Sequence, residues 1–187
     1  MIHTVDYIVP VADALPSDLC KELIQKFEKK ASGHTIHDED KQKFSELNLS
    51  NDPDFEKECN IIHSASSYLM DFYKKEVGVK YFPTSYRFEE FRMKKYEPDG
   101  KQQFDWHADV GDYSSARRFM VCFFYLNTVI EGGNTLFDWS EDENEAAIVN
   151  PEEGKAVLFP PFWTHPHKGT KPISGPKYII STYAHFI

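Results

Sequence analysis

The chain has 187 residues, a formal net charge of −9 at pH 7 and an aromatic content of 15%. This length suits a single domain with a hydrophobic core. The acidic balance argues against a nucleic-acid partner, because phosphate binding depends on clustered Lys and Arg. A neutral or basic protein segment fits such a chain better. No stretch approaches transmembrane length, so we expect no membrane partner.

The amino terminus and the cysteines indicate a protein from a reducing compartment. Its amino terminus, residues 1–6, lacks both a basic segment and a long apolar segment, so we predict no signal peptide. The three cysteines are odd in number and scattered, which disfavours a disulfide framework. We therefore expect a cytoplasmic protein, and the sequence does not indicate its oligomeric state.

The amino-terminal part favours helices. Ser17 is placed to cap a helix that ends near residues 32–33. Its apolar residues recur at helical spacing at Leu19, Leu23 and Phe27. Residues 31–50 are predicted to form a loop.

A second helix is expected to begin near Pro53 and to end at Gly78. Its apolar stripe comprises Phe55, Cys59, Ile62, Leu69 and Tyr73. We interpret residues 1–82 as a helical support region whose helices cover the outer face of a sheet.

After Pro83 the pattern changes to short strands separated by turns, which indicates a sandwich or barrel over residues 83–187. The predicted strands are Tyr86 to Tyr96, Phe104 to Asp109, Phe119 to Leu126, Thr135 to Phe137, Ala146 to Val149, Lys155 to Phe159 and Tyr178 to Phe186. Residues 111–115 form a polar loop that could close over a substrate. The acidic run 141–145 is interpreted as a solvated loop, with attraction of a cationic peptide as the alternative.

Three residues in this region could bind one metal ion. His107 and Asp109 lie at positions i and i+2, which point to the same face of a strand. His167, from another strand, would complete a set of two histidines and one carboxylate. Non-heme Fe(II) oxygenases use this arrangement, which leaves coordination positions open for chemistry.

Several ordered motifs resemble those of the 2-oxoglutarate and Fe(II)-dependent dioxygenases, in particular the prolyl 4-hydroxylase-like branch. The matching segments are His107-Ala108-Asp109, Tyr125-Leu126-Asn127, the Gly-Gly-x-Thr-x-Phe segment at 132–137, and the closing run from His167-Lys168-Gly169 to Lys177-Tyr178. The resemblance covers about residues 86–186.

The resemblance implies a double-stranded β-helix core, a jelly-roll or cupin-like fold of mainly β structure with supporting helices, in one domain over residues 1–187. It implies Fe(II), 2-oxoglutarate and O2, with ascorbate as an optional addition. It also implies that decarboxylation of 2-oxoglutarate to succinate and CO2 is coupled to hydroxylation of a C–H bond, with C4 of a peptidyl proline as the expected target. The partner is then a peptide or protein substrate that contains proline.

The resemblance assigns roles to further residues. Lys177 follows the second histidine by ten positions and would bind the distant carboxylate of 2-oxoglutarate. Its flanks are apolar, and a buried ammonium needs an anionic partner. Tyr96, Tyr125 and Thr135 match positions that line or bind this cosubstrate, although each could be an ordinary sheet residue.

His165 is the alternative second histidine, but His167 is the one followed by x-Gly and spaced correctly from the lysine. Arg118 matches an arginine implicated in positioning the substrate. Two positions depart from the family pattern, with Phe104 in place of a tyrosine and Tyr183 in place of a tryptophan. Because these positions concern the substrate, they leave its identity open.

Two other functions stay open at this point. One is oxidation of a free amino acid or another small molecule by the same chemistry. The other is a non-catalytic β-helix domain that binds a metal or a partner.

Overall fold

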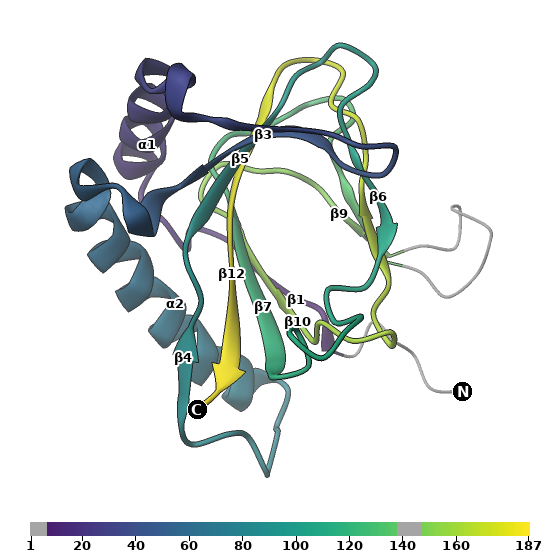
Figure 1. Ribbon diagram of the computed structural model, residues 1–187. Coiled ribbons are helices and arrows are strands. Elements are labelled where there is room, and N and C mark those ends of the chain that lie inside the picture. Colours follow the sequence, from purple (N-terminus) through teal and green to yellow (C-terminus); the bar gives the residue numbers. More distant parts are fainter. Residues whose placement is uncertain (1–6, 138–146) are drawn as a thin grey trace.

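The computed structural model describes residues 7–137 and 147–187. In these residues two antiparallel sheets face each other, and two helices cover the outer face of the larger sheet (Figure 1). This arrangement confirms the predicted fold of mainly β structure with supporting helices and a jelly-roll core.

The larger sheet has eight strands in the described residues, and its order is β1-β10-β7-β12-β5-β3-β2, with β4 paired to β12. The bounds are β1 Val9–Val11, β2 Thr35–Asp38, β3 Lys43–Asn48, β4 Tyr86–Phe88, β5 Arg92–Tyr96, β7 Arg118–Tyr125, β10 Ala156–Phe159 and β12 Lys177–Phe186. The long strands β7 and β12 lie side by side at the centre of this sheet.

The smaller sheet has the order β6-β11-β8-β9 in the described residues. Its strands are β6 Phe104–His107, β8 Thr135–Phe137, β9 Ala147–Val149 and β11 His167–Gly169. The two sheets meet along one side, where the Lys43 amide donates to the Gln103 carbonyl at 2.9 Å and the Asp105 amide donates to the Lys41 carbonyl at 2.8 Å. These bonds connect the turn between β2 and β3 to the start of β6.

Helices α1 Ser17–Lys29 and α2 Glu56–Glu76 lie on the far side of the larger sheet, and the short 3-10 turns η2 Ala31–Gly33, η3 Leu49–Asn51 and η4 Pro53–Phe55 connect them to it. The buried residues of α1 are Leu19, Cys20, Leu23 and Phe27, which confirms the predicted apolar stripe. Gly78 follows α2 with a φ of 69°, a conformation that suits glycine and ends the helix. No helix among the described residues has the length and apolarity needed to cross a membrane.

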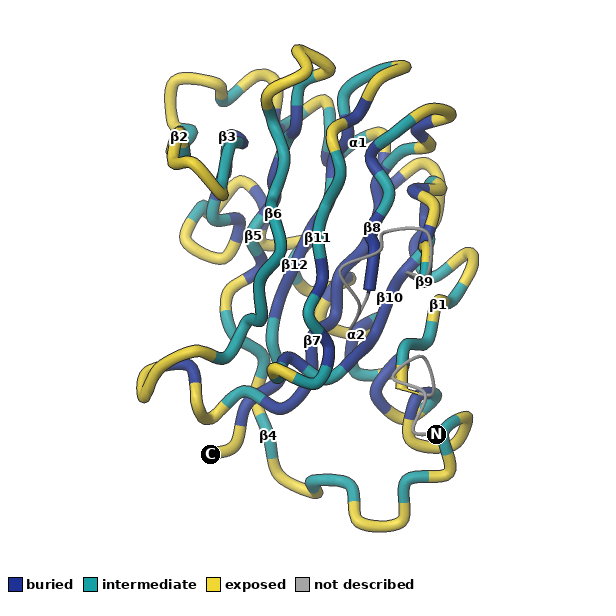
Figure 2. Tube along the Cα trace, turned by 90° about the vertical axis from the view of Figure 1, so that its right-hand side faces the viewer, coloured by how far each residue is buried: buried dark blue, intermediate teal, exposed yellow. Residues whose placement is uncertain are grey.

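Strand β7 is buried on both faces because successive side chains point to opposite sides of the sheet. Cys122 and Phe124 belong to the core beneath the helices, whereas Phe123 and Tyr125 belong to the core between the sheets. Figure 2 shows buried residues concentrated along β7, β8 and β10, with exposed residues gathered in the loops. The alternation fixes which side chains of each strand can reach the space between the sheets.

The prediction of a loop over residues 31–50 was wrong. This segment contains β2 and β3, and β3 pairs with β5 in the larger sheet. The strand signal was weak because β2 is an exposed edge strand and because the buried positions of β3 include Glu46 beside Phe44 and Leu47. The described part of the segment 1–82, residues 7–82, therefore supplies three strands in addition to helices.

Other boundaries also differ from the prediction. Ser17 does not cap α1; Pro16 precedes the helix, and no side chain caps it. The predicted strand from Tyr86 to Tyr96 is interrupted at residues 89–91, where Glu89 bonds through its backbone to β12. The acidic run 141–145 and Ala146 lie outside the described residues.

Candidate active site

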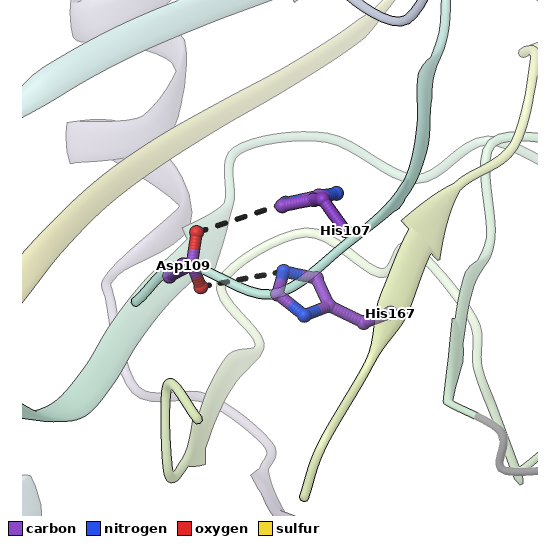
Figure 3. Close-up of side chains that lie close together, drawn as sticks. All are labelled: His107, Asp109 and His167. Atoms are coloured by element: carbon purple, nitrogen blue, oxygen red, sulfur yellow. Dashed lines mark ion pairs between the residues drawn. The ribbon is translucent and has the colours of Figure 1, made fainter. Parts of the chain in front are cut away.

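The strand register brings the two histidines together. His107 ends β6 and His167 begins β11, and these residues are direct partners in the antiparallel pairing of the two strands. Their ring centroids lie 4.2 Å apart. Asp109 follows two residues after β6 and completes the group (Figure 3).

The three side chains have the geometry of a metal site. The Nε2 atom of His107 lies 3.6 Å from Oδ1 of Asp109, and the Nε2 atom of His167 lies 3.4 Å from Oδ2 of the same carboxylate. One potential ligand atom from each of the three lies within 4.8 Å of the others. One ion can therefore contact all three residues.

Both histidines are oriented by backbone carbonyls. Nδ1 of His107 lies 2.6 Å from the Asp105 carbonyl, and Nδ1 of His167 lies 3.2 Å from the His165 carbonyl. A carbonyl only accepts hydrogen bonds, so each ring carries its proton on Nδ1 and leaves the Nε2 lone pair for a metal. Burial, reinforced by the neighbouring His167, lowers the pKa of His107 to about 3 and keeps that ligand neutral.

The Asp109 carboxylate has one satisfied and one unsatisfied oxygen. The Tyr183 hydroxyl donates to Oδ1 at 2.7 Å, whereas Oδ2 is buried and accepts no hydrogen bond from the residues that the structure describes. Burial alone would raise the pKa of Asp109, but the neighbouring His167 and the hydrogen bond from the Tyr183 hydroxyl hold it below its ordinary value. A buried, ionised oxygen without a partner is costly. A bound cation would satisfy it, so the donor set fits a divalent metal.

The backbone around Asp109 is fixed even though β6 ends before it. The Val110 amide donates to the Pro161 carbonyl at 3.1 Å, and Nη1 of Arg118 donates to the Asp109 carbonyl at 3.1 Å. The same arginine donates through Nε and Nη2 to both oxygens of Glu89, at 3.0 and 2.8 Å. The main chain at Asp109 is therefore held by Arg118 of β7, which is itself fixed by Glu89 from the segment between β4 and β5.

The triad lies between two cavities, which share His107, Asp109 and Tyr183 in their linings. We call the first the inner cavity; it extends between the sheets to Tyr96, Thr135, Gly169 and Lys177. We call the second the outer cavity; it extends past Glu46, Glu89, Arg92 and Arg118. A ligand in either cavity would lie beside the triad.

Lys177 lies in the lining of the inner cavity with only 2% of its surface exposed. Its Nζ donates to the Gly133 carbonyl at 3.1 Å and lies 4.5 Å from the centre of the Tyr96 ring. No acidic side chain of the described residues pairs with it, and burial lowers the pKa of this lysine to about 7. An anion in the inner cavity would restore its full charge.

Two glycines make room around this ammonium. A Cβ atom on Gly169 would lie 3.3 Å from Nζ of Lys177, and one on Gly133 would lie 3.4 Å from its Cδ atom. Gly133 also has a φ of 72°, which side chains rarely adopt. The glycines of the two motifs therefore keep this part of the inner cavity open beside the lysine.

The remaining residues predicted to line the cosubstrate site lie in the same part of the fold. The hydroxyls of Tyr125 and Thr135 lie 2.6 Å apart, and Thr135 and Tyr96 both line the inner cavity. Tyr125 is fully buried, its hydroxyl also donates to the Val149 carbonyl at 3.3 Å, and it is not in the lining. Tyr125 therefore does not line the cavity itself but contacts Thr135, which does.

The two residues predicted to contact a substrate lie together in the outer cavity. The guanidinium of Arg118 lies 3.8 Å from the centre of the Tyr183 ring. Burial and the adjacent Asp109 raise the pKa of Tyr183 well above its ordinary value, so its hydroxyl stays protonated and donates. Phe104 stacks on the His107 ring at a centroid distance of 3.6 Å.

The structure also separates the two candidate histidines. His165 is buried and its Nδ1 lies 2.9 Å from the Thr164 hydroxyl, and it is not part of the three-residue group. Sequence reasoning missed Lys94, which lines both cavities and is 8% exposed. Its position two residues before Tyr96, on the same face of β5, was the signal that could have revealed it.

Together, the two-sheet fold, the two-histidine and carboxylate group and the buried lysine fit a metal-dependent enzyme whose inner cavity could accept an anion. The sequence profile of the 2OG-Fe(II) oxygenase superfamily matches residues 91–185, which contain all of these site residues. The chain therefore belongs to this superfamily, as the motifs predicted, and it is a 2-oxoglutarate-dependent dioxygenase that uses Fe(II), 2-oxoglutarate and O2. No curated protein sequence matches the chain significantly.

Solved structures with a similar fold include three prolyl hydroxylases. A Pseudomonas putida prolyl-4-hydroxylase has a TM-score of 0.74 and 19% identity over 96% of this chain and 92% of its own. The viral collagen prolyl hydroxylase of Paramecium Bursaria Chlorella virus-1, solved with 2-oxoglutarate, has a TM-score of 0.73 and 18% identity over 97% of both chains. A Trichoplax adhaerens prolyl hydroxylase, solved with a peptide of hypoxia inducible factor, has a TM-score of 0.73 and 16% identity over 96% of this chain and 84% of its own.

Proposed function

We propose that the chain hydroxylates a proline of a peptide or protein at C4, with His107, Asp109 and His167 holding Fe(II). The observation that supports the metal assignment is the buried Oδ2 atom of Asp109, which lies 3.4 Å from Nε2 of His167 and lacks a hydrogen-bond partner among the described residues. A divalent cation would satisfy that oxygen and both imidazoles at once.

We propose further that Lys177 binds the distant carboxylate of 2-oxoglutarate in the inner cavity, beside Tyr96, Thr135 and Tyr125. The ammonium is buried, and in the described residues it donates to one carbonyl, that of Gly133, so a carboxylate would supply the missing counter-charge. Thr135 and Tyr96 line the same cavity, and Tyr125 orients the Thr135 hydroxyl.

When bound with O2, Fe(II) and 2-oxoglutarate supply the oxidation: one oxygen atom enters the substrate as a hydroxyl, the other enters succinate, and CO2 leaves. The chain's own residues bind, orient and exclude water. Arg118 and Tyr183 form one wall of the outer cavity and would position the substrate beside the triad.

Proline is the proposed acceptor because the three solved structures described above are prolyl hydroxylases, one of them solved with a peptide. The second candidate acceptor is a free amino acid or another small molecule. The charged side chains that line the outer cavity favour it, because a neutral peptide segment offers them little to bind.

We also propose that the protein works in a reducing compartment such as the cytoplasm. All three cysteines are free, and Cys20 and Cys122 are buried. Burial raises the pKa of Cys122 to about 12, so this thiol is unreactive and suits a core position.

The test is succinate formation from 2-oxoglutarate in air with Fe(II), with and without a proline-rich peptide. We expect the peptide to stimulate turnover and to gain one oxygen atom on proline, as read by mass spectrometry. A peptide of the same length with alanine in place of proline is the matched control. Turnover that ignores the peptide would reject the peptidyl-proline assignment and keep the oxygenase.

A further inference from the structure

The outer cavity has a volume of about 400 Å³, and many of its lining side chains are charged. Its acidic side chains are Glu46, Glu89, Glu90 and Asp109, and its basic side chains are Arg92, Lys94 and Arg118. The volume is that of a typical small-ligand pocket. The way these charges are paired decides what ligand the cavity can hold.

Both arginines already have close acidic partners. Arg118 binds Glu89 through two hydrogen bonds of 3.0 and 2.8 Å. Arg92 donates to Oε1 of Glu46 at 2.8 Å, and a second ion pair joins it to Glu90 at 3.8 Å. The carboxylates along this wall are therefore neutralised by guanidinium groups.

Lys94 lacks such a partner. It lies opposite Glu46 in the pairing of β5 with β3, but its Nζ is 4.0 Å from Oε2 of that carboxylate, which Arg92 approaches more closely. The ammonium lies 5.1 and 5.6 Å from the centres of the Phe44 and Phe104 rings. Within the described part of the chain it makes no hydrogen bond, although an ammonium can donate three.

The position of Lys94 relates it to Lys177. In the pairing of β5 with β12, Tyr96 lies opposite Lys177, and Lys94 lies opposite Ile179. Lys94 is therefore displaced from Lys177 by two residues along β12, in the direction of Tyr183. Both ammonium groups are buried; in the described residues Lys177 has no acidic partner, and the ion pair of Lys94 with Glu46 is a long one of 4.0 Å. Lys94 also lines the outer cavity, which Lys177 does not.

We propose that Lys94 binds a carboxylate of the substrate in the outer cavity, so that the acceptor carries a negative charge close to the carbon that is oxidised. This inference rests on the proposed function, which places the substrate in that cavity. The carboxylate could be the α-carboxylate of the acceptor residue itself or the side chain of an acidic neighbour. Either source would supply the hydrogen-bond acceptors and the counter-charge that the buried ammonium lacks.

The experiment compares probes that differ only in a carboxylate and its amide. The pairs are free L-proline with L-prolinamide, acetyl-Gly-Pro with acetyl-Gly-Pro-amide, and acetyl-Pro-Glu-amide with acetyl-Pro-Gln-amide. We measure both stimulated succinate formation and equilibrium binding in the presence of Mn(II) and 2-oxoglutarate without O2. We expect the carboxylate member of at least one pair to bind roughly tenfold or more tightly, as a charge-assisted hydrogen bond implies.

Three variants test whether Lys94 causes the preference for the carboxylate probe. Lys94→Met keeps the length of the side chain and removes its charge, so it should abolish the preference for the carboxylate. Lys94→Arg keeps the charge and should retain part of it. Lys95→Met is the matched control, because Lys95 points to the opposite face of β5 and pairs with Glu28 and Glu97 outside the cavities.

The outcomes separate this proposal from the proposed function. Equal binding of every pair by the wild type, or an unchanged preference in Lys94→Met, would overturn the role of Lys94. A Lys94→Met variant that only needs more 2-oxoglutarate would also overturn it, because the lysine would then serve the cosubstrate. Absence of 2-oxoglutarate turnover in the wild type would reject the proposed function. The equilibrium binding of the carboxylate and amide probes would still test the role of Lys94.

Discussion

The two faces of the larger sheet use the same strands for opposite purposes. On β7 and β12, Phe124 and Ile180 point to the helices and are completely buried among apolar side chains. On the other face of β12, Lys177 and Tyr183 point to the cavities. The helix-covered face excludes water and stabilises the fold, whereas the cavity face buries charged groups that oppose folding and that we propose bind ligands.

We therefore predict that substitutions on one face mainly change the free energy of unfolding and that substitutions on the other face mainly change ligand binding. On the helix-covered face, a change should lower the free energy of unfolding with no specific effect on ligands. On the cavity face, a change should alter ligand binding at little cost in stability, or even with a gain.

The largest effect is expected from His167→Ala, which removes one of the three proposed metal ligands. Outer partners of metal ligands typically contribute roughly 10- to 100-fold in affinity, so loss of a ligand should weaken metal binding by more than that. Titration with Co(II), followed by its absorption, measures this directly. His165→Ala is the control and should bind the metal as the wild type does; equal losses in both variants would contradict the assignment of His167.

Phe124→Ala tests the other face. Truncating a fully buried phenylalanine leaves a cavity beneath the helices and should lower the free energy of unfolding by about 3–5 kcal/mol. Denaturant unfolding gives this value. At a temperature where the variant is folded, its metal affinity should equal that of the wild type. A selective loss of metal binding would contradict the claim that the helix-covered face affects stability alone.

Lys177→Met is expected to raise the 2-oxoglutarate concentration needed for half-maximal turnover by roughly 10- to 100-fold, since a charge-assisted hydrogen bond is lost. The variant should unfold at an equal or higher temperature, because the buried ammonium that it removes opposes folding. A variant that is destabilised and still binds 2-oxoglutarate normally would show that Lys177 serves the fold.

The smallest effect is a pH dependence. Burial lowers the pKa of Lys177 to about 7 in the ligand-free protein, so the ammonium loses its proton as the pH rises through that value. Binding a carboxylate requires the charged form, so between pH 7 and pH 8 the affinity for 2-oxoglutarate should fall by up to about tenfold. Direct binding measured from pH 6 to 9 tests this, and Lys177→Met should show no such slope.

The sequence predicted the proposed metal ligands and the lysine because their signals are local. His107 and Asp109 are two residues apart, and the motif from His167 to Lys177 is continuous in the chain. The apolar runs of β7 and β12 were equally visible because both faces of these strands are covered. Local spacing of this kind can be read without knowledge of tertiary contacts.

The outer cavity could not be predicted in the same way. Glu46 and Lys94 face each other only because β3 pairs with β5, and β3 was mistaken for a loop. A buried charge looks like a surface charge in a sequence, so the apolar alternation of β3 was obscured by Glu46. The break at residues 89–91, which places Glu89 against Arg118, likewise depends on contacts with β12.

We propose that the residues of the cavity face form the active site of this 2-oxoglutarate-dependent dioxygenase. The most direct measurement is succinate formation from 2-oxoglutarate in air with Fe(II) and no added substrate, in the wild type and in His167→Ala. We expect slow, iron-dependent turnover in the wild type and none in the variant. Equal succinate formation in both proteins, or none in a wild type that binds Fe(II) and 2-oxoglutarate, would contradict it.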